Sequence, residues 1–258
     1  MTQEPQNGCG VRLRVEGQVA TVTLDTPSRL NCQTPSTWRE LAAIGARLDS
    51  AIRVVVVRGE GRAFSAGLDR SLFSGDPDVV DGLAALATGS DAEIVEGIAT
   101  FQAGFSWLTA GPAISIAAVQ GHAVGAGFQL ALACDLRVLT EDASLAMAET
   151  SLGLVPDLTG TWPLVRAVGY PRALEICATG RKVGAAEAVA IGLANAVVPA
   201  DQLAGAVQDL VAALLAAPAA SAAATKQLLL GAGDRTRTDQ CAAERLAQLP
   251  LLRQFAQR

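Results

Sequence analysis

Runs of apolar residues in the first 140 positions predict strands of two kinds. Val11–Val15 and Val19–Leu24 alternate apolar and polar side chains around Glu16-Gly17-Gln18, which is the pattern of a β-hairpin. Val54–Val57 and Ile114–Val119 are mainly β-branched and small apolar residues, which is typical of strands buried on both faces. Shorter strands are expected later in the chain, at Asp135–Leu139 and Ser144–Ala148, and a short apolar piece lies at Ala196–Pro199.

Helical periodicity fills the intervals between these strands. Thr34-Pro35 begins a helix, with a capping hydroxyl and a proline in its first turn, and Asp91 begins a second. Asp76–Ser90 is small, polar and poorly periodic, and we expect a loop there. The alternation of strands and helices over residues 50–140 predicts an α/β fold with mostly parallel strands and right-handed crossovers. The apolar faces of the two helices consist of Trp38, Leu41, Ile44 and Leu48, and of Ile94, Ile98, Phe101, Phe105 and Leu108.

From Thr161 onward the pattern is almost entirely helical. We expect a core of residues 1–200 that carries the binding site and a C-terminal helical region of residues 201–258. The helices expected in this half are Pro171–Ala178, Gly184–Ile191, Asp201–Ala216, Ala219–Leu230 and Asp234–Phe255, the last interrupted at Pro250.

The stretch Val119–Leu139 is the centre of the predicted architecture. Its glycines at 121, 125 and 127 follow a strand and mark a turn, and from Ala126 to Cys134, where we expect a helix, nearly every side chain is apolar. A helix of that kind is buried on all sides, and its first backbone N–H groups have no partner inside the helix. These N–H groups therefore offer a place for an anion or for a carbonyl oxygen that gains negative charge, although a tight turn chosen for packing explains the glycines as well.

Composition narrows the classes of function. The 258-residue chain has a formal net charge of −5, which argues against a nucleic-acid-binding surface. His122 is the single histidine and the five cysteines show no paired spacing, so we expect neither a multi-histidine metal site nor a disulfide framework. The N-terminus does not resemble a signal peptide, and no apolar run reaches the roughly 20 residues of a membrane span. We expect a cytoplasmic protein without a membrane span.

Two loops follow buried strands in the same manner. Ser65-Ala66-Gly67 comes after the strand at Val54–Val57, and Gly125-Ala126-Gly127 comes after the strand at Ile114–Val119. Neighbouring parallel strands place such loops side by side at their carboxyl edge, where α/β sheets bind ligands. One N–H group from each loop can then hold one oxygen atom, as in an oxyanion hole.

Four motifs in order resemble the crotonase (enoyl-CoA hydratase/isomerase) superfamily over about residues 10–230. They are GRAFSAGLD, GHAVGAGFQLALACDLRV, ETSLGLVPDLTGTWPLVRAVG and GRKVGAAEAVAIGLANAVVPADQL. The resemblance implies a spiral of ββα turns with a C-terminal helical region used for trimerisation, assembled as a trimer or hexamer. It also implies an acyl-CoA thioester as ligand, with coenzyme A as part of the substrate and no separate cofactor or metal.

The same resemblance assigns residues to the site. The N–H groups of Ala66 and Ala126 match the family's oxyanion hole, which holds the thioester carbonyl as it becomes an enolate. The segment Ala63–Asp69 matches the loop that lies along coenzyme A. The residues expected to bind substrate are Ala63, Ser65, Gly67, Leu68, Asp69, Gly125 and Gln129.

The acid–base positions depart from the pattern of the hydratases. Family hydratases carry two glutamates, but Gln129 stands at the first position and only Glu149 matches the second. A glutamine amide cannot accept a proton near neutral pH. Asp157 matches an aspartate of dienoyl-CoA isomerases, where hydratases usually have glycine, although an N-cap role explains it equally well. We expect Glu149 to be catalytic, with Asp157 as a possible second carboxylate.

The most favoured function is therefore movement of a double bond in an enoyl- or dienoyl-CoA, with proton transfer by Glu149. Two alternatives stay open: an enoyl-CoA hydratase with an altered acid–base pair, and a non-catalytic acyl-CoA-binding protein that retains the pocket. Another reaction of the family, such as thioester hydrolysis or decarboxylation, is a further option.

Overall fold

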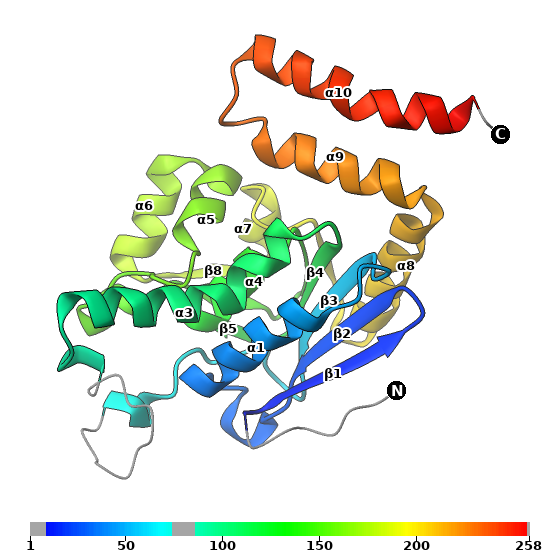
Figure 1. Cartoon of the computed structure of the whole chain (residues 1–258). Helices are drawn as coiled ribbons and strands as arrows, with labels where there is room; N and C mark the ends of the chain where they lie inside the picture. The colour runs from blue at the N-terminus through cyan, green and yellow to red at the C-terminus, as the bar shows by residue number, and fades with distance from the viewer. Residues whose placement is uncertain (1–8, 74–85, 257–258) are drawn as a thin grey trace.

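A computed structural model describes residues 9–73 and 86–256. The predicted loop at Asp76–Ser90 falls largely outside these residues. The described chain forms a mixed α/β fold in which a six-stranded sheet, ordered β1-β2-β3-β4-β6-β9, is followed by a smaller sheet, ordered β5-β7-β8 (Figure 1).

The larger sheet has the predicted direction of its strands. β1 (Val11–Glu16) and β2 (Val19–Leu24) form the antiparallel hairpin, and β2 then pairs in parallel with β3 (Val54–Gly59). The remaining neighbours, β4 (Ile114–Val119), β6 (Leu136–Thr140) and β9 (Ala196–Val198), also pair in parallel. The smaller sheet consists of β5 (His122–Val124), β7 (Ser144–Ala146) and β8 (Lys182–Gly184).

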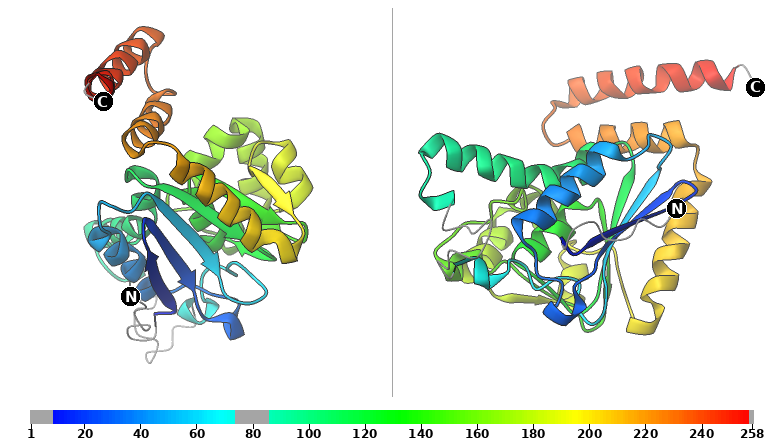
Figure 2. Two further views of the ribbon diagram at one scale, coloured as in Figure 1. Left: turned by 90° about the vertical axis from the view of Figure 1, so that its right-hand side faces the viewer. Right: turned by 60° about the horizontal axis from the view of Figure 1, so that its bottom comes forward.

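Both faces of the larger sheet are covered, which explains the continuous apolar runs. Val55 and Val57 of β3 join the main core together with Phe105, while Val54 and Val56 join a second cluster with Val207. The helices α1 (Pro35–Arg47) and α3 (Asp91–Ala110) pack on the first side. On the second side α8 (Leu203–Ala216) crosses the strands, as the left view of Figure 2 shows.

The strands and helices that carry the candidate site repeat a ββα order. β4 and β5 lead into α4 (Ala126–Ala133), and β6 and β7 lead through η3 (Glu149–Leu152) to α5 (Thr161–Val168). This confirms the expected spiral of ββα turns. All eight residues of α4 are buried, as its composition predicted. The chain continues through α6 (Tyr170–Thr179) and α7 (Ala185–Ala190).

The last helix of the chain, α10 (Arg237–Phe255), lies farther from the sheets than α9 (Ala219–Gly231) does. α9 follows α8, and α10 lies along α9 at the upper edge of Figure 1. The expected interruption at Pro250 was wrong, because α10 continues through that residue. Proline removes one backbone donor, and on this uncovered helix the released carbonyl is accessible to water.

Among the described residues, no single helix is both long and apolar enough to cross a membrane. Only the pair Ala200–Ala216 and Ala219–Gly231 passes on length and composition together, and its two halves are bent by 104°.

Candidate active site

The loops after β3 and β4 lie side by side, as their positions in the sequence predicted. The Ser65 N–H donates to the carbonyl of His122 over 2.9 Å, and the Val124 N–H donates to the carbonyl of Ser65 over 3.0 Å. Gly67 has a φ of +82°, and a Cβ atom there would lie 2.2 Å from the Val124 oxygen and 3.4 Å from the Ala126 nitrogen. Glycine is therefore required at 67 by both the backbone conformation and the closeness of the second loop.

Ala126 is the first residue of α4, so its N–H has no partner within the helix. The residue before it, Gly125, has a φ of +52° and donates its own N–H to Ala146 over 2.8 Å. No hydrogen bond among the described residues uses the Ala126 N–H. It remains available at the positive end of the helix dipole.

The assignment of the other oxyanion donor to Ala66 was wrong. The Ala66 N–H donates to the carbonyl of Leu30 over 2.8 Å, so it is already engaged. Leu68 lies two residues further along the same loop and forms a parallel β-bridge with Gln33. The hydrogen bonds of this bridge are made by the residues on either side of Leu68: the Gly67 carbonyl accepts from the Gln33 N–H, and the Asp69 N–H donates to the Gln33 carbonyl. The N–H of Leu68 itself points away from Gln33, and within the described chain it has no hydrogen-bond partner.

Several predicted substrate-binding side chains instead hold the loop in shape. Ala63 and Ser65 are buried, and the Ser65 hydroxyl donates to the carbonyl of Asn31 over 2.7 Å. Asp69 accepts from the N–H of Ser71 over 3.0 Å and forms an ion pair with Arg29. These contacts fix the backbone between β3 and η2 (Arg70–Phe73) rather than present polar side chains to a ligand.

Glu149 begins η3 and lies against the glycine turn. One carboxylate oxygen, Oε1, lies 3.4 Å from the position of a Cβ atom on Gly125 and accepts a hydrogen bond of 2.7 Å from Nε2 of Gln129. The other oxygen, Oε2, is buried without a hydrogen-bond partner among the described residues. Burial raises the pKa of Glu149 above its ordinary value, and the charge of Asp157 adds to that rise, while the Gln129 hydrogen bond opposes it.

Asp157 lies near enough to Glu149 for its charge to contribute to the raised pKa of Glu149. Burial raises the pKa of Asp157 as well. Its backbone carbonyl accepts a hydrogen bond of 2.7 Å from Gln102 of α3. The N-cap residue of α5 is Gly160, so Asp157 does not cap that helix.

Two other polar side chains differ in their exposure. Lys226 of α9 is buried and forms an ion pair of 2.8 Å with Asp135, so it cannot bind a phosphate group. His122 is exposed at the start of β5. No group of three or more histidine, cysteine, aspartate or glutamate side chains suited to a metal ion occurs among residues 9–73 and 86–256.

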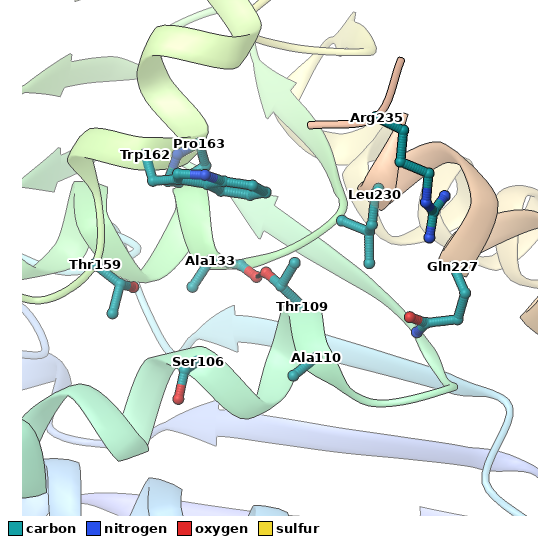
Figure 3. A pocket seen from close by; sticks show the side chains of 11 residues that line it. Ser106, Thr109, Ala110, Ala133, Thr159, Trp162, Pro163, Gln227, Leu230 and Arg235 are labelled. Carbon is teal, nitrogen blue, oxygen red and sulfur yellow. Dashed lines mark hydrogen bonds between the residues drawn. The ribbon is translucent and has the colours of Figure 1, made fainter. Parts of the chain in front are cut away.

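A pocket of about 460 Å³ opens between α3, α5 and α9 (Figure 3). Ser106 and Thr109 come from α3, Trp162 from α5, and Leu230 from α9; Arg235 extends into it from the segment after α9. Its wall includes Thr159, which lies between Asp157 and Gly160 in sequence, but neither Glu149 nor Ala126 lines it. The pocket therefore adjoins the turn that carries Asp157 without containing the oxyanion donor or Glu149.

Comparison with known proteins gives one consistent result. Residues 14–251 match the family model described as enoyl-CoA hydratase/isomerase. A Rhizobium meliloti protein described as a probable enoyl-CoA hydratase is 35% identical over 193 residues, which cover 74% of this chain and 69% of the relative. The (E)-benzylidenesuccinyl-CoA hydratase of Thauera aromatica is 32% identical and covers 84% of this chain and 80% of its own length.

Solved structures agree with the sequence comparison. A Thermobifida fusca protein described as a "putative enoyl-CoA hydratase", in complex with acetoacetyl-CoA, superposes with a TM-score of 0.91 at 49% identity. The match covers 95% of this chain and 96% of that protein. A Streptomyces coelicolor protein with the same description superposes with a TM-score of 0.86 at 29% identity, covering 97% of this chain and 89% of the other.

Proposed function

Because this chain belongs to the enoyl-CoA hydratase/isomerase family, we propose that it moves a double bond within an enoyl- or dienoyl-CoA thioester. The observation that carries the proposal is the pairing of one buried carboxylate, Glu149, with a neutral amide, Gln129. This arrangement leaves one base beside the oxyanion donors where family hydratases have two glutamates.

Two backbone N–H groups, those of Leu68 and Ala126, form the proposed oxyanion hole. Both are unengaged within the described chain, and the loops that carry them meet at Gly67. Together they would stabilise the negative charge that develops on the thioester oxygen when the carbon next to it loses a proton. Loss of one such donor typically costs about 3–4 kcal/mol of transition-state stabilisation.

Proton transfer in this proposal begins at Oε2 of Glu149. The carboxylate removes a proton from C2 of a 3-enoyl-CoA, and the electron pair spreads over C2, C3, C4 and the thioester oxygen. Return of a proton to C4 leaves the double bond between C2 and C3. A carboxylate whose pKa is raised by burial suits this transfer, since it is a stronger base than an ordinary glutamate when it takes the proton from C2 and returns one to C4.

Hydration is the second candidate, and it has specific support. The Rhizobium meliloti and Thauera aromatica relatives are both described as hydratases. Asp157 supplies a second carboxylate, whose charge reaches Glu149. Glu149 and Asp157 would then divide the tasks of activating water and protonating C2.

One labelling experiment separates these reactions. The protein is incubated with 3-enoyl-CoA and with 2-enoyl-CoA in heavy water, and the products are followed by mass spectrometry and NMR. Deuterium at C4 without a 3-hydroxyacyl product supports isomerisation, whereas a 3-hydroxyacyl product with deuterium at C2 supports hydration. Binding of acyl-CoA with no shift of the double bond, no 3-hydroxyacyl product and no deuterium at either carbon would contradict both and favour a protein that only binds the thioester.

Assembly into a homo-oligomer, a trimer or a hexamer, is also proposed. α10 buries none of its residues, and Leu246, Leu252 and Phe255 on it are 71%, 56% and 75% exposed. Large exposed apolar surfaces of this kind mark sites of protein association. The acyl-CoA thioester and further copies of the chain are thus the proposed partners.

A further inference from the structure

Gln129 is buried and makes hydrogen bonds through both ends of its side-chain amide. Its nitrogen donates to Oε1 of Glu149 over 2.7 Å. Its oxygen accepts from the backbone N–H of Leu158 over 2.8 Å and from that of Gly160 over 3.2 Å. A single side chain of α4 thus joins the carboxylate of η3 to the turn that follows Asp157.

The orientation of this amide is determined by its partners. The N–H groups of Leu158 and Gly160 can only donate, so the amide oxygen must face them. The amide nitrogen must then face Glu149, and it can only donate there. Oε1 is consequently an acceptor in both protonation states of Glu149, and an acidic proton on this residue belongs on Oε2.

The turn held by Gln129 has a conformation that favours glycine. Thr159, between the two donated N–H groups, has a φ of +70°, which is unusual for a β-branched residue. Such conformations cost about 1–3 kcal/mol and persist where surrounding contacts enforce them. The two hydrogen bonds to Gln129 provide that enforcement on either side of Thr159.

Close packing of Gly160 on Gln129 supports the same interpretation. A Cβ atom on Gly160 would lie 2.7 Å from Cγ and 3.0 Å from Oε1 of Gln129. The φ of Gly160 is −67°, which any residue can adopt, so its need for glycine arises from the Gln129 side chain and not from the backbone.

We propose that Gln129 is a positioning residue, which fixes Glu149 and the Asp157 turn relative to each other and restricts proton transfer to Oε2 of Glu149. The effect on catalysis rests on the proposed function, whereas the effect on the Glu149 carboxylate does not. Two titratable groups face Glu149 from other segments: Asp157, and the Cys177 thiol of α6, whose pKa is raised by burial and then by the charge of Glu149.

The test uses two variants that disturb the amide by different routes and one control. Gln129→Met keeps the length of the side chain but removes its donor and acceptor. Gly160→Ala keeps both Gln129 and Glu149 in the sequence, but its added methyl group displaces the Gln129 amide. Gly184→Ala is the matched control, because Gly184 has a φ of −79° and open space around its Cβ position.

The pKa of Glu149 is measured in the protein without ligand, by following the infrared band of its carboxyl group as a function of pH. The spectrum of the Glu149→Gln variant is subtracted to isolate that band. We expect a higher pKa in Gln129→Met, a smaller rise in Gly160→Ala, and no change in Gly184→Ala. In a protein that already carries Gln129→Ala, the further change Gly160→Ala should not shift the pKa of Glu149, since the two residues act through one contact. Turnover should fall about 100-fold in Gln129→Met, with KM altered less than about threefold.

The outcomes are distinct. An unchanged pKa and kcat in both Gln129→Met and Gly160→Ala would overturn the proposal and make Gln129 a packing residue. Shifts of the Glu149 pKa in a protein that turns over no thioester would support the positioning of Glu149 while refuting the proposed function. If Gln129→Met does not fold, Gly160→Ala and its control still decide the question.

Discussion

Nε2 of Gln129 lies 2.7 Å from Oε1 of Glu149, while Oε2 of the same carboxylate is buried and has no hydrogen-bond partner among the described residues. One oxygen is occupied by a neutral donor and the other is free for a proton. Glu149 also lies against Gly125, the residue before the Ala126 N–H. The following predictions test this geometry and the structure that supports it.

Replacement of Glu149 by glutamine should abolish proton transfer and preserve binding. The variant keeps the size of the side chain and still accepts a hydrogen bond from Gln129, but it has no basic oxygen. We expect turnover to fall by about 100- to 10,000-fold, with the Kd for acyl-CoA changed little. Deuterium incorporation and calorimetric titration measure the two effects, and retention of wild-type turnover would exclude Glu149 as the base.

Replacement of Gln129 by glutamate should change the reaction as well as its pH dependence. Two carboxylates would then face each other where an amide nitrogen now lies 2.7 Å from Glu149. Carboxylates at that separation share a proton, so the acidic limb of the kcat/KM profile should move to higher pH. The ratio of 3-hydroxyacyl product to isomerised product should rise; an unchanged ratio would show that residue 129 does not decide between hydration and isomerisation.

Replacement of Gly67 by alanine tests whether the two loops meet. The added Cβ would lie 2.2 Å from the Val124 oxygen, so one loop must move away from the other. We expect kcat to fall about 100-fold or more. Gly17→Ala is the control, because Gly17 also has a positive φ, +57°, but has nothing within 4 Å of its Cβ position. Equal kinetics in the two variants would mean that the loops do not need their close approach.

The pH dependence of stability should reveal the two partly buried carboxylates, Glu149 and Asp157. A raised pKa in the folded state means that Glu149 and Asp157 oppose folding once they ionise. Relative to Glu149→Gln or Asp157→Asn, the unfolding free energy of the wild type should stay constant below the unfolded pKa. It should then decline as pH rises through the folded pKa, by about 1.4 kcal/mol for each pH unit between the unfolded and the folded pKa. Urea unfolding at several pH values measures this, and a difference that does not vary with pH would contradict it.

Removal of the buried cation Lys226 should destabilise the chain strongly. Its ammonium donates to the carbonyls of Leu108 and Ala113 and pairs with Asp135. Lys226→Met leaves that carboxylate unpaired, at an expected cost of about 3–5 kcal/mol in urea unfolding. The exposed Lys182 provides the control, and Lys182→Met should change stability by less than about 0.5 kcal/mol. Comparable losses in both variants would argue against the internal ion pair as an anchor.

Hydrophobic patterning located β3, β4 and α4, although it did not indicate the short strand β5 between β4 and α4. The four consecutive valines of β3 indicated a strand covered on both faces, and the structure divides them between two apolar clusters. The uniform composition of α4 indicated a buried helix, and its glycines marked the turn. These features are local, because they depend on which face of an element meets water.

The finer assignments depended on pairings between distant segments. The Ala66 N–H is engaged because Leu30 lies beside it, and no local pattern reports that contact. The same holds for the N–H groups of Leu158 and Gly160, which meet Gln129 about 30 positions away. The burial of Lys226 is equally invisible to a local pattern, since its partner Asp135 is 91 residues away.

Helix α4 begins at Ala126, beside Glu149, and the residue two places after its end is Asp135, the partner of Lys226 on α9. One short, fully buried helix therefore connects the candidate active site at Glu149 to the ion pair that holds α9. None of its residues faces solvent, so none can be substituted without changing the packing around it. A substitution that changes the packing of α4 is consequently expected to disturb both the contact between Gln129 and Glu149 and the position of α9.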